Sequence, residues 1–235
     1  MHASALVAGG FVILPIVVSA MFVLGCEWAA RRLGEPEPVR RRHTMLLTIA
    51  TIGWLVLTAG VAATGVLRRF DWVPPPFAGL LISIPLVGIV VSFSRLGTLL
   101  VRGLPLAALV GSQVFRFPLE LVMHRAHVEE VMPVQMSFAG YNYDILTGIT
   151  AGLLAIWLTA GRVPRWVVAV WNVAGLALLV NVVTIAIVST PLFRWFGDEQ
   201  LNVFVTYAPY VWLPAVLVTA ALIGHLLVSR ALSAR

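Results

Sequence analysis

Residues 6–28 read LVAGGFVILPIVVSAMFVLGCEW and decide the class of fold, because they contain no charged residue before Glu27. A helix rises about 1.5 Å per residue, so about 20 apolar residues match the roughly 30 Å hydrocarbon core of a bilayer. Only His2 offers a basic group before this run, and no small-residue cleavage site ends it. We therefore expect a retained helix and not a removable signal peptide.

The whole chain repeats this pattern. Hydrophobic residues make up 60% and charged residues 11% of the 235 residues, whereas soluble domains have about 25% charged residues. The connections between apolar runs leave no room for a soluble domain. We predict an all-α integral membrane protein, a single domain over 1–235 that forms a bundle of seven transmembrane helices. The seven runs are 6–28, 44–67, 77–94, 104–126, 145–161, 166–188 and 207–229.

The arginine distribution predicts the orientation of the bundle, because basic residues are retained on the cytoplasmic side of a membrane. The first, third and fifth connections and the C-terminal tail hold Arg31, Arg32, Arg40, Arg41, Arg42, Arg95, Arg102, Arg162, Arg165, Arg230 and Arg235. The other connections hold only Arg68, Arg69, Arg125 and Arg194. This asymmetry predicts an N-terminus outside and a C-terminus in the cytoplasm.

Composition also limits the source, the partners and the cofactors. The chain has no lysine and is rich in Ala, Val, Leu and Gly, which is typical of a high-GC bacterial genome and indicates the bacterial cytoplasmic (inner) membrane. The net charge of +6 comes from short arginine-rich connections, which suit anionic lipid head groups and not nucleic acid. Without lysine there is no retinal Schiff base. With Cys26 as the single cysteine there is no disulfide or iron–sulfur cluster.

The fourth run contains the main functional signal. Ionisable residues inside a membrane cost at least about 2.5–3.5 kcal/mol each, so they normally face the bundle interior and pair with one another. Arg116 and Glu120 are four residues apart, and this spacing predicts an ion pair between them. Spacings of three or four residues place one polar stripe on a single helix face, formed by Gln113, Arg116, Glu120, His124 and His127.

The outer end of this stripe has the residue types of a metal site. Glu120, His124 and His127 occupy positions i, i+4 and i+7, and Asp144 begins the next helix. A carboxylate and two imidazoles suit zinc or another divalent transition metal, with Asp144 as a fourth ligand. The alternatives are that the histidines are wetted at the membrane interface or take part in proton transfer, and that Asp144 caps its helix.

Further polar residues extend the predicted site. The connection 132–144 reads MPVQMSFAGYNYD and is expected to fold over the helix ends, while Asn181 and Thr184 lie at a similar depth on the sixth run. We predict an outward-facing ligand cavity formed by Gln113, Arg116, Glu120, Asn142, Asn181 and Thr184. His225 is placed near the inner face, away from this cavity.

Two packing features complete the sequence-based expectations. Gly148 and Gly152 form a small-xxx-small pair that allows close helix approach. Residues 191–207 combine aromatic and acidic side chains, a pattern that favours a helix lying on the outer surface.

Three classes of function follow from these features. The first is binding of a small ligand or divalent metal in the outward-facing cavity, with or without catalysis. The second is a small-solute or proton-coupled transporter or channel, which requires polar residues that continue toward the inner side. The third is a non-catalytic subunit or scaffold, either as a homo-oligomer or within a membrane complex.

Overall fold

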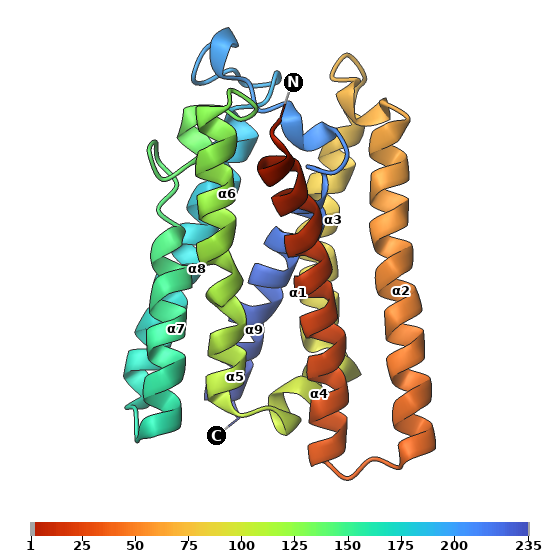
Figure 1. Ribbon diagram of the computed structural model, residues 1–235, viewed down its shortest axis with the longest axis vertical. Helices are drawn as coiled ribbons and strands as arrows, with labels where there is room; N and C mark the ends of the chain where they lie inside the picture. Colours follow the sequence, from red (N-terminus) through yellow and green to blue (C-terminus); the bar gives the residue numbers. More distant parts are fainter. Residues whose placement is uncertain (1–2, 235) are drawn as a thin grey trace.

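The computed structural model describes residues 3–234, and the regular secondary structure of this part of the chain is entirely helical, with no β-strand. The helices run roughly parallel to one long axis, with the two termini at opposite ends (Figure 1). The α-helices are α1 (Ala5–Arg32), α2 (Glu37–Ala63), α3 (Pro76–Phe93), α4 (Arg95–Gly103), α5 (Leu106–Gly111), α6 (Arg116–Val128), α7 (Ile145–Ala160), α8 (Arg165–Val188) and α9 (Thr219–Ser233).

Six spans among the described residues are long and apolar enough to cross a membrane, as in a multi-pass membrane protein. The predicted runs agree with them in place, although α2 begins earlier than run 44–67 and the last span begins later, at Leu213. The remaining apolar helix, α7, has 16 residues, which is just below the usual range of about 17–25 for a transmembrane helix. The count of seven crossings and the orientation remain predictions.

Side-chain exposure is reversed relative to a soluble protein. Large apolar side chains point outward along the long helices, and α2 alone exposes Met45, Leu46, Ile49, Ile52, Val56 and Leu57. Soluble monomers rarely expose contiguous apolar surface of this extent. Lipid is the solvent that suits such a surface.

Two segments differ from the sequence-based expectations. The connection at 95–103 forms α4, an amphipathic helix begun by the N-cap Ser94, whose hydroxyl oxygen accepts from the backbone N–H groups of Leu96 and Gly97. The predicted surface helix at 191–207 was wrong. That segment consists of turns and two short 3-10 helices, Asp198–Gln200 and Phe204–Thr206, because Pro191, Gly197 and local hydrogen bonds favour turns over a continuous helix.

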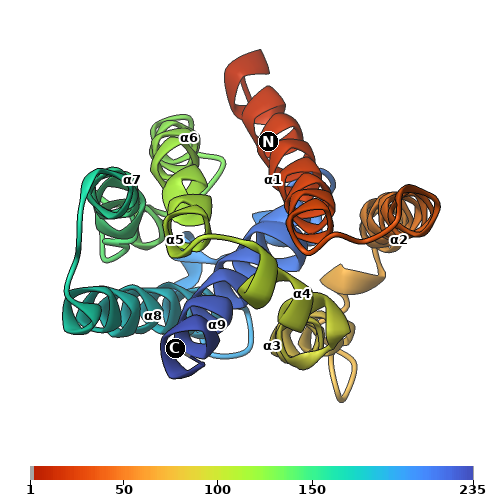
Figure 2. The same ribbon diagram turned by 90° about the horizontal axis from the view of Figure 1, so that it is seen from below.

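The span containing the polar stripe is not one regular helix. A 3-10 helix, Ser112–Phe115, joins α5 to α6. Pro118 lacks the N–H that would bond the carbonyl of Val114 in a continuous α-helix, which explains the break at this point. The last span begins as a π-helix, Leu213–Val218, and continues as α9. This span is the most buried of the six and lies near the centre of the bundle, with α2 at the periphery (Figure 2).

Helices α6 and α7 approach closely at Gly148. A Cβ atom at Gly148 would collide with the backbone of Phe117 and lie 2.9 Å from the carbonyl carbon of Arg116. A Cβ atom at Gly152 would meet only the Cγ2 of Val114 at 3.6 Å, an ordinary contact. The predicted small-xxx-small pair is therefore one essential glycine and one tolerant glycine.

We predict that Gly148→Ala destabilises the folded protein by about 1–3 kcal/mol, because an added methyl in a packed interface forces the backbones apart. Gly152→Ala is the matched control and should leave stability nearly unchanged. Thermal unfolding of both variants in detergent measures the difference. Equal losses for the two substitutions would contradict the assigned contact.

The start of α1 is tied to the end of α6 outside the membrane-spanning segments. The backbone N–H of Ser4 donates to Oε2 of Glu129 at 2.8 Å, and Arg125 donates to Oε1 at 2.6 Å. The backbone N–H of Ser4, then the Ser4 hydroxyl and Arg125, hold the pKa of Glu129 below its ordinary value. Ionised Glu129 therefore fastens the two helix ends together.

A pH dependence follows from the lowered pKa of Glu129. The contribution to stability is present above the unfolded-state pKa and is lost as pH falls through the lower folded-state pKa. Glu129→Gln should therefore lower the melting temperature at neutral pH and lose this effect in acid. Glu130→Gln alters an exposed neighbour and serves as control. A difference between wild type and Glu129→Gln that is constant across pH would refute the assignment.

Candidate functional site

The centre of the site is an ion pair between Arg116 and Asp144, which are 1% and 4% exposed. Arg116 Nε donates to Asp144 Oδ2 at 2.6 Å, and a second guanidinium nitrogen donates to Oδ1. The pairing is bidentate, which matches the planar guanidinium to the carboxylate. Arg116 is the first residue of α6 and Asp144 immediately precedes α7, so the pair joins the two helices.

His225 on α9 is the third member of the centre, and its hydrogen bonds define its tautomer. Asn172 Nδ2 donates to the backbone carbonyl of His225 and to the Ser229 hydroxyl, so Asn172 Oδ1 must be the acceptor 2.9 Å from His225 Nδ1. His225 Nδ1 therefore carries the proton, and its Nε2 accepts from Arg116 at 2.7 Å. A neutral imidazole beside the guanidinium satisfies every one of these bonds.

Glu120 joins the centre through an amide and not through a cation. Asn142 Nδ2 lies 2.8 and 3.0 Å from the two carboxylate oxygens of Glu120, and 3.0 Å from the Met136 carbonyl. Asn142 Oδ1 accepts from the backbone N–H of Asp144 at 3.0 Å. One continuous set of hydrogen bonds, here called the polar network, thus connects Glu120, Asn142, Asp144, Arg116, His225, Asn172 and Ser229.

Glycine allows α8 to reach this network. A Cβ atom at Gly175 would lie 2.5 Å from the His225 ring and 2.9 Å from the Thr147 methyl. The Thr147 hydroxyl in turn donates to Asp144 Oδ1 at 3.3 Å. Small residues at these crossings let four helices bring their polar groups together in the low-dielectric interior.

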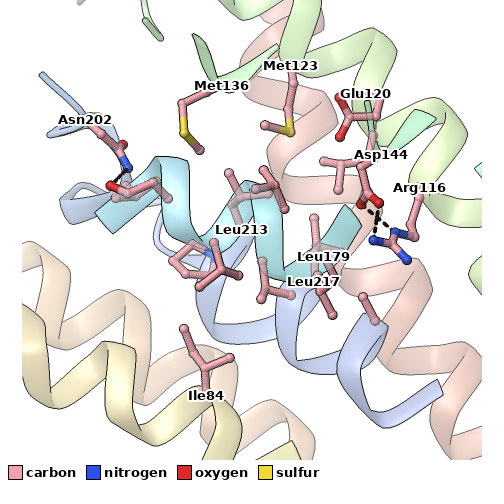
Figure 3. A pocket seen from close by; sticks show the side chains of 18 of the residues that line it. Ile84, Arg116, Glu120, Met123, Met136, Asp144, Leu179, Asn202, Leu213 and Leu217 are labelled. Carbon is pink, nitrogen blue, oxygen red and sulfur yellow. Dashed lines mark hydrogen bonds and ion pairs between the residues drawn. The ribbon is translucent and has the colours of Figure 1, made fainter. Parts of the chain in front are cut away.

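A small cavity of about 60 Å³ borders the network. Glu120, Asp144 and Arg116 lie at one end of the surrounding side chains, and Asn202 lies at the other (Figure 3). The Oδ1 atom of Asn202 is buried and has no hydrogen-bond partner among the described residues. One water needs about 10–15 Å³ of such volume, so the cavity has room for a few waters or a very small solute, and hydrogen-bond acceptors stand at both ends.

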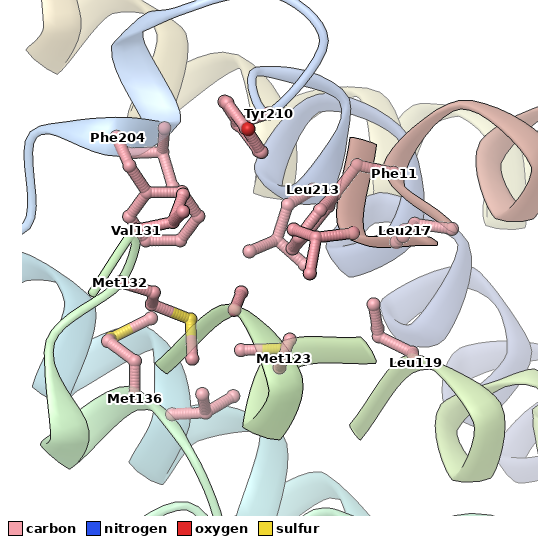
Figure 4. Close-up of a cluster of buried hydrophobic side chains, with 14 of the residues drawn as sticks. Phe11, Leu119, Met123, Val131, Met132, Met136, Phe204, Tyr210, Leu213 and Leu217 are labelled. Carbon is pink, nitrogen blue, oxygen red and sulfur yellow. The ribbon is translucent and has the colours of Figure 1, made fainter. Parts of the chain in front are cut away.

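A cluster of buried apolar side chains shares several residues with the lining of the cavity (Figure 4). Phe11, Phe204 and Tyr210 pack edge to face, with ring centroids 5.1 to 6.2 Å apart. Met123 and Met136 belong to the same cluster and also line the cavity. Methionine side chains repack easily, so this cluster is the adaptable wall of the site.

The structure corrects the predicted pairing within the fourth run. Arg116 and Glu120 do not form an ion pair among the described salt bridges, and Arg116 pairs with Asp144 instead. The alternative role of Asp144 as a helix cap is met only in position, since Asp144 is the N-cap residue of α7 but its side chain makes no capping bond. Its two oxygens are directed to the guanidinium because the charge-assisted bidentate bond is stronger than a cap.

The residues predicted as metal ligands are separated. Between residues 3 and 234 there is no group of three or more His, Cys, Asp or Glu side chains that could hold a metal ion. The His124 ring stacks on Phe138 at 4.3 Å, and its centroid is 6.4 Å from that of His127. Glu120 and Asp144 face the cavity, but neither histidine lines it. The proposed zinc ligands therefore do not converge.

The other residues predicted to form the ligand cavity lie outside the polar network. Asn181 donates to the Tyr141 carbonyl at 2.9 Å and so holds the connection 132–144 against α8. Thr184 is exposed and donates to the Val180 carbonyl of its own helix. Gln113 is 1% exposed but lies outside the lining of the small cavity. Only Arg116, Glu120 and Asn142 of the six belong to the polar network.

Sequence reasoning did not include His225 or Asn172 in the site. The sequence predicts a last helix at 207–229, which puts His225 near its inner end, whereas the last span is Leu213–Ser233. In the structure His225 Nε2 lies 2.7 Å from a guanidinium nitrogen of Arg116. The spacing from Asn172 to its partners could not be read from the sequence, since they lie on another helix.

Comparisons with known proteins give no functional assignment: no protein-family model, curated protein or solved structure matches the chain.

We predict that Arg116→Gln or Asp144→Asn alone lowers the free energy of unfolding by about 3–5 kcal/mol, because each leaves an uncompensated buried charge. The double variant should be more stable than either single variant. Chemical unfolding in detergent provides the measurement. Disrupting the exposed pair Arg194–Asp198 is the control, with an expected loss of about 0–1 kcal/mol. Additive losses in the buried pair would exclude it as the organising interaction.

Proposed function

We propose that the chain is a proton-coupled transporter of a small solute and that Glu120 is the group that takes up and releases the proton. The observation that carries this proposal is the charge count of the polar network. Arg116 and Asp144 compensate each other, and His225 is neutral by its hydrogen bonds. Glu120 is 2% exposed and is the one ionisable group of the network without a compensating partner, so protonation neutralises it.

The extent of the polar network also favours a transporter, because a transporter requires polar residues that continue toward the inner side. Beyond His225 it continues through Asn172 to Ser229, one turn before the end of α9 at Ser233. Polar groups therefore extend from the small cavity into the half of the bundle that contains the C-terminus. A closed outward-facing pocket does not need this continuation.

The lining of the small cavity favours a solute that donates hydrogen bonds. Glu120, Asp144 and Asn202 present acceptor oxygens at its ends, while its remaining lining is mostly apolar. Drug-sized ligand sites have about 300–1,000 Å³, so the 60 Å³ cavity suits a much smaller molecule or a few proton-carrying waters. Loss of the proton from Glu120 would leave a carboxylate that attracts a cationic or donor-rich solute.

The membrane arrangement completes the proposal. Seven crossings, with α7 as a short seventh helix, would place the N-terminus outside and the C-terminus in the cytoplasm of a bacterial inner membrane. The arginine distribution supports this orientation. In that arrangement Glu120 lies in the outer half and the Asn172–Ser229 end of the polar network lies toward the cytoplasm.

Two measurements test the role of Glu120. Infrared difference spectra of the protein in lipid, recorded between acidic and alkaline buffer, should contain the carbonyl band of a protonated carboxyl group, and Glu120→Gln should remove this band. In vesicles with an enclosed pH-sensitive dye, gradients of small amines and amino acids supply the solute panel. At least one should drive proton movement through wild type, with at least a tenfold loss in Glu120→Gln.

The control is Glu199→Gln, which replaces an exposed carboxylate and should change neither measurement. An infrared band that persists in Glu120→Gln assigns the proton to another group and overturns the proposal. Proton movement that is equal in wild type and Glu120→Gln does the same.

A further inference from the structure

Asn202 forms the end of the small cavity that is remote from Glu120 (Figure 3). It is 1% exposed and lies in the connection between α8 and the last span. Its backbone N–H donates to the Ser189 carbonyl at 2.8 Å, and its Nδ2 donates to the Ala186 carbonyl at 3.0 Å. A carbonyl oxygen can only accept, so this second bond identifies the amide nitrogen and leaves Oδ1 as an acceptor.

The position of Asn202 is fixed by its surroundings, while its Oδ1 atom is left over. Gln135 Nε2 donates to the Ser189 hydroxyl at 3.0 Å and to the Gln200 carbonyl at 2.7 Å, which holds the connection on both sides of Asn202. Within the part of the chain that the structure describes, Oδ1 is buried and has no hydrogen-bond partner. A buried acceptor without a donor is unfavourable and rare, so a donor on a bound molecule would complete it.

The opposite end of the small cavity favours a cation. Glu120 lines this end and receives a hydrogen bond from the Asn142 amide but no ion pair. Once Glu120 has released its proton, a positively charged group on the solute would supply the counter-charge that the protein does not provide.

The wall between the two polar ends is apolar and short. Ile84, Leu179, Leu213 and Leu217 are among its side chains (Figure 3). The cavity has a volume of about 60 Å³, and one water needs about 10–15 Å³ of such volume. It therefore has room for roughly four to six groups of the size of a water molecule or a methylene.

A second cavity, here called the large apolar cavity, does not offer the same ends. It has a volume of about 800 Å³ and is bounded by α1, α2, α3, α4, α5 and the last span. None of its lining residues is charged, and neither Glu120 nor Asn202 is among them. Recognition of a small cation with a second polar group therefore belongs to the small cavity.

We propose that the solute of the small cavity is a short aliphatic amine with a second hydrogen-bond donor, a hydroxyl or amino group, at its other end. This inference rests on the proposed function, in which Glu120 becomes ionised and binds the cationic amino group. Asn202 is the specificity-determining residue, because its Oδ1 accepts from the second donor. Amino acids are rejected, since their carboxylate has no donor and would face an acceptor oxygen at either end.

Two probes of equal size test this recognition. Ethanolamine and n-propylamine have the same number of non-hydrogen atoms and differ by a hydroxyl in place of a methyl group. Titration calorimetry of the protein in detergent, in buffer that keeps both amines protonated, measures their dissociation constants. Wild type should bind ethanolamine about tenfold more tightly, because a site built for a donor is left unpaired by the analogue that lacks it. Glycine should not bind.

Asn202→Leu should reduce the preference for ethanolamine to about one, because both amines then meet an apolar side chain. Gln113→Leu is the matched control. Gln113 is also 1% exposed, and neither polar atom of its amide has a partner between residues 3 and 234, but it does not line the small cavity. This control should keep the tenfold preference. The wild-type comparisons with n-propylamine and glycine need no variant and stand even if Asn202→Leu fails to fold.

Three results would overturn the proposal: equal binding of ethanolamine and n-propylamine by wild type, a preference that survives in Asn202→Leu, or glycine bound as tightly as ethanolamine. The first would mean that only water meets Oδ1 of Asn202. Failure of the proposed function looks different. Proton movement that is unchanged in Glu120→Gln, together with an ethanolamine preference that requires Asn202, would refute proton coupling and support this recognition.

Discussion

The bidentate pairing of Arg116 with Asp144 is the interaction on which the rest of the bundle depends. Neither charge can face lipid without a large penalty, so the start of α6 and the start of α7 must meet inside the protein. Close contact of these helices requires the glycine at 148. The same guanidinium also donates to His225, which fixes the depth and rotation of α9.

The remaining polar residues are arranged around that pair. Asn142 uses its amide nitrogen for Glu120 and its amide oxygen for the Asp144 backbone, so the connection before α7 is shaped by both carboxylates. Glu120 is thereby held near an ion pair but receives no positive charge of its own. A change in its protonation would alter the donors and acceptors that Asn142 must satisfy, and this links protonation to the position of the 132–144 connection.

The last span lies between the polar network and the large apolar cavity. One face carries His225 into the polar network, while Gly224 faces Gln113 and the large apolar cavity. The π-helical start of the span contains Ala215, whose carbonyl accepts from Trp54 and so ties α2 to the last span. A movement of α9 would therefore change the shape of both cavities, because the last span packs against most of the other helices (Figure 2).

Part of the site could be predicted from the sequence because intramembrane charges are rare. The stripe on the fourth run correctly indicated Arg116 and Glu120 as interior residues. The partner of Arg116 was wrong because i, i+4 spacing makes a pair geometrically available in any helix, whereas the strongest acceptor lay 28 residues away. The convergence of Glu120 with His124 failed for a related reason, since His124 rotates onto Phe138.

The sequence by itself determined that the chain is helical and suited to a membrane, because run length and the absence of charge depend on local composition alone. It also indicated the helix that contains Arg116 and Glu120. Only the tertiary structure decided their partners, the tautomer of His225 and the unpaired state of Gln113. These depend on the depth and rotation of neighbouring helices.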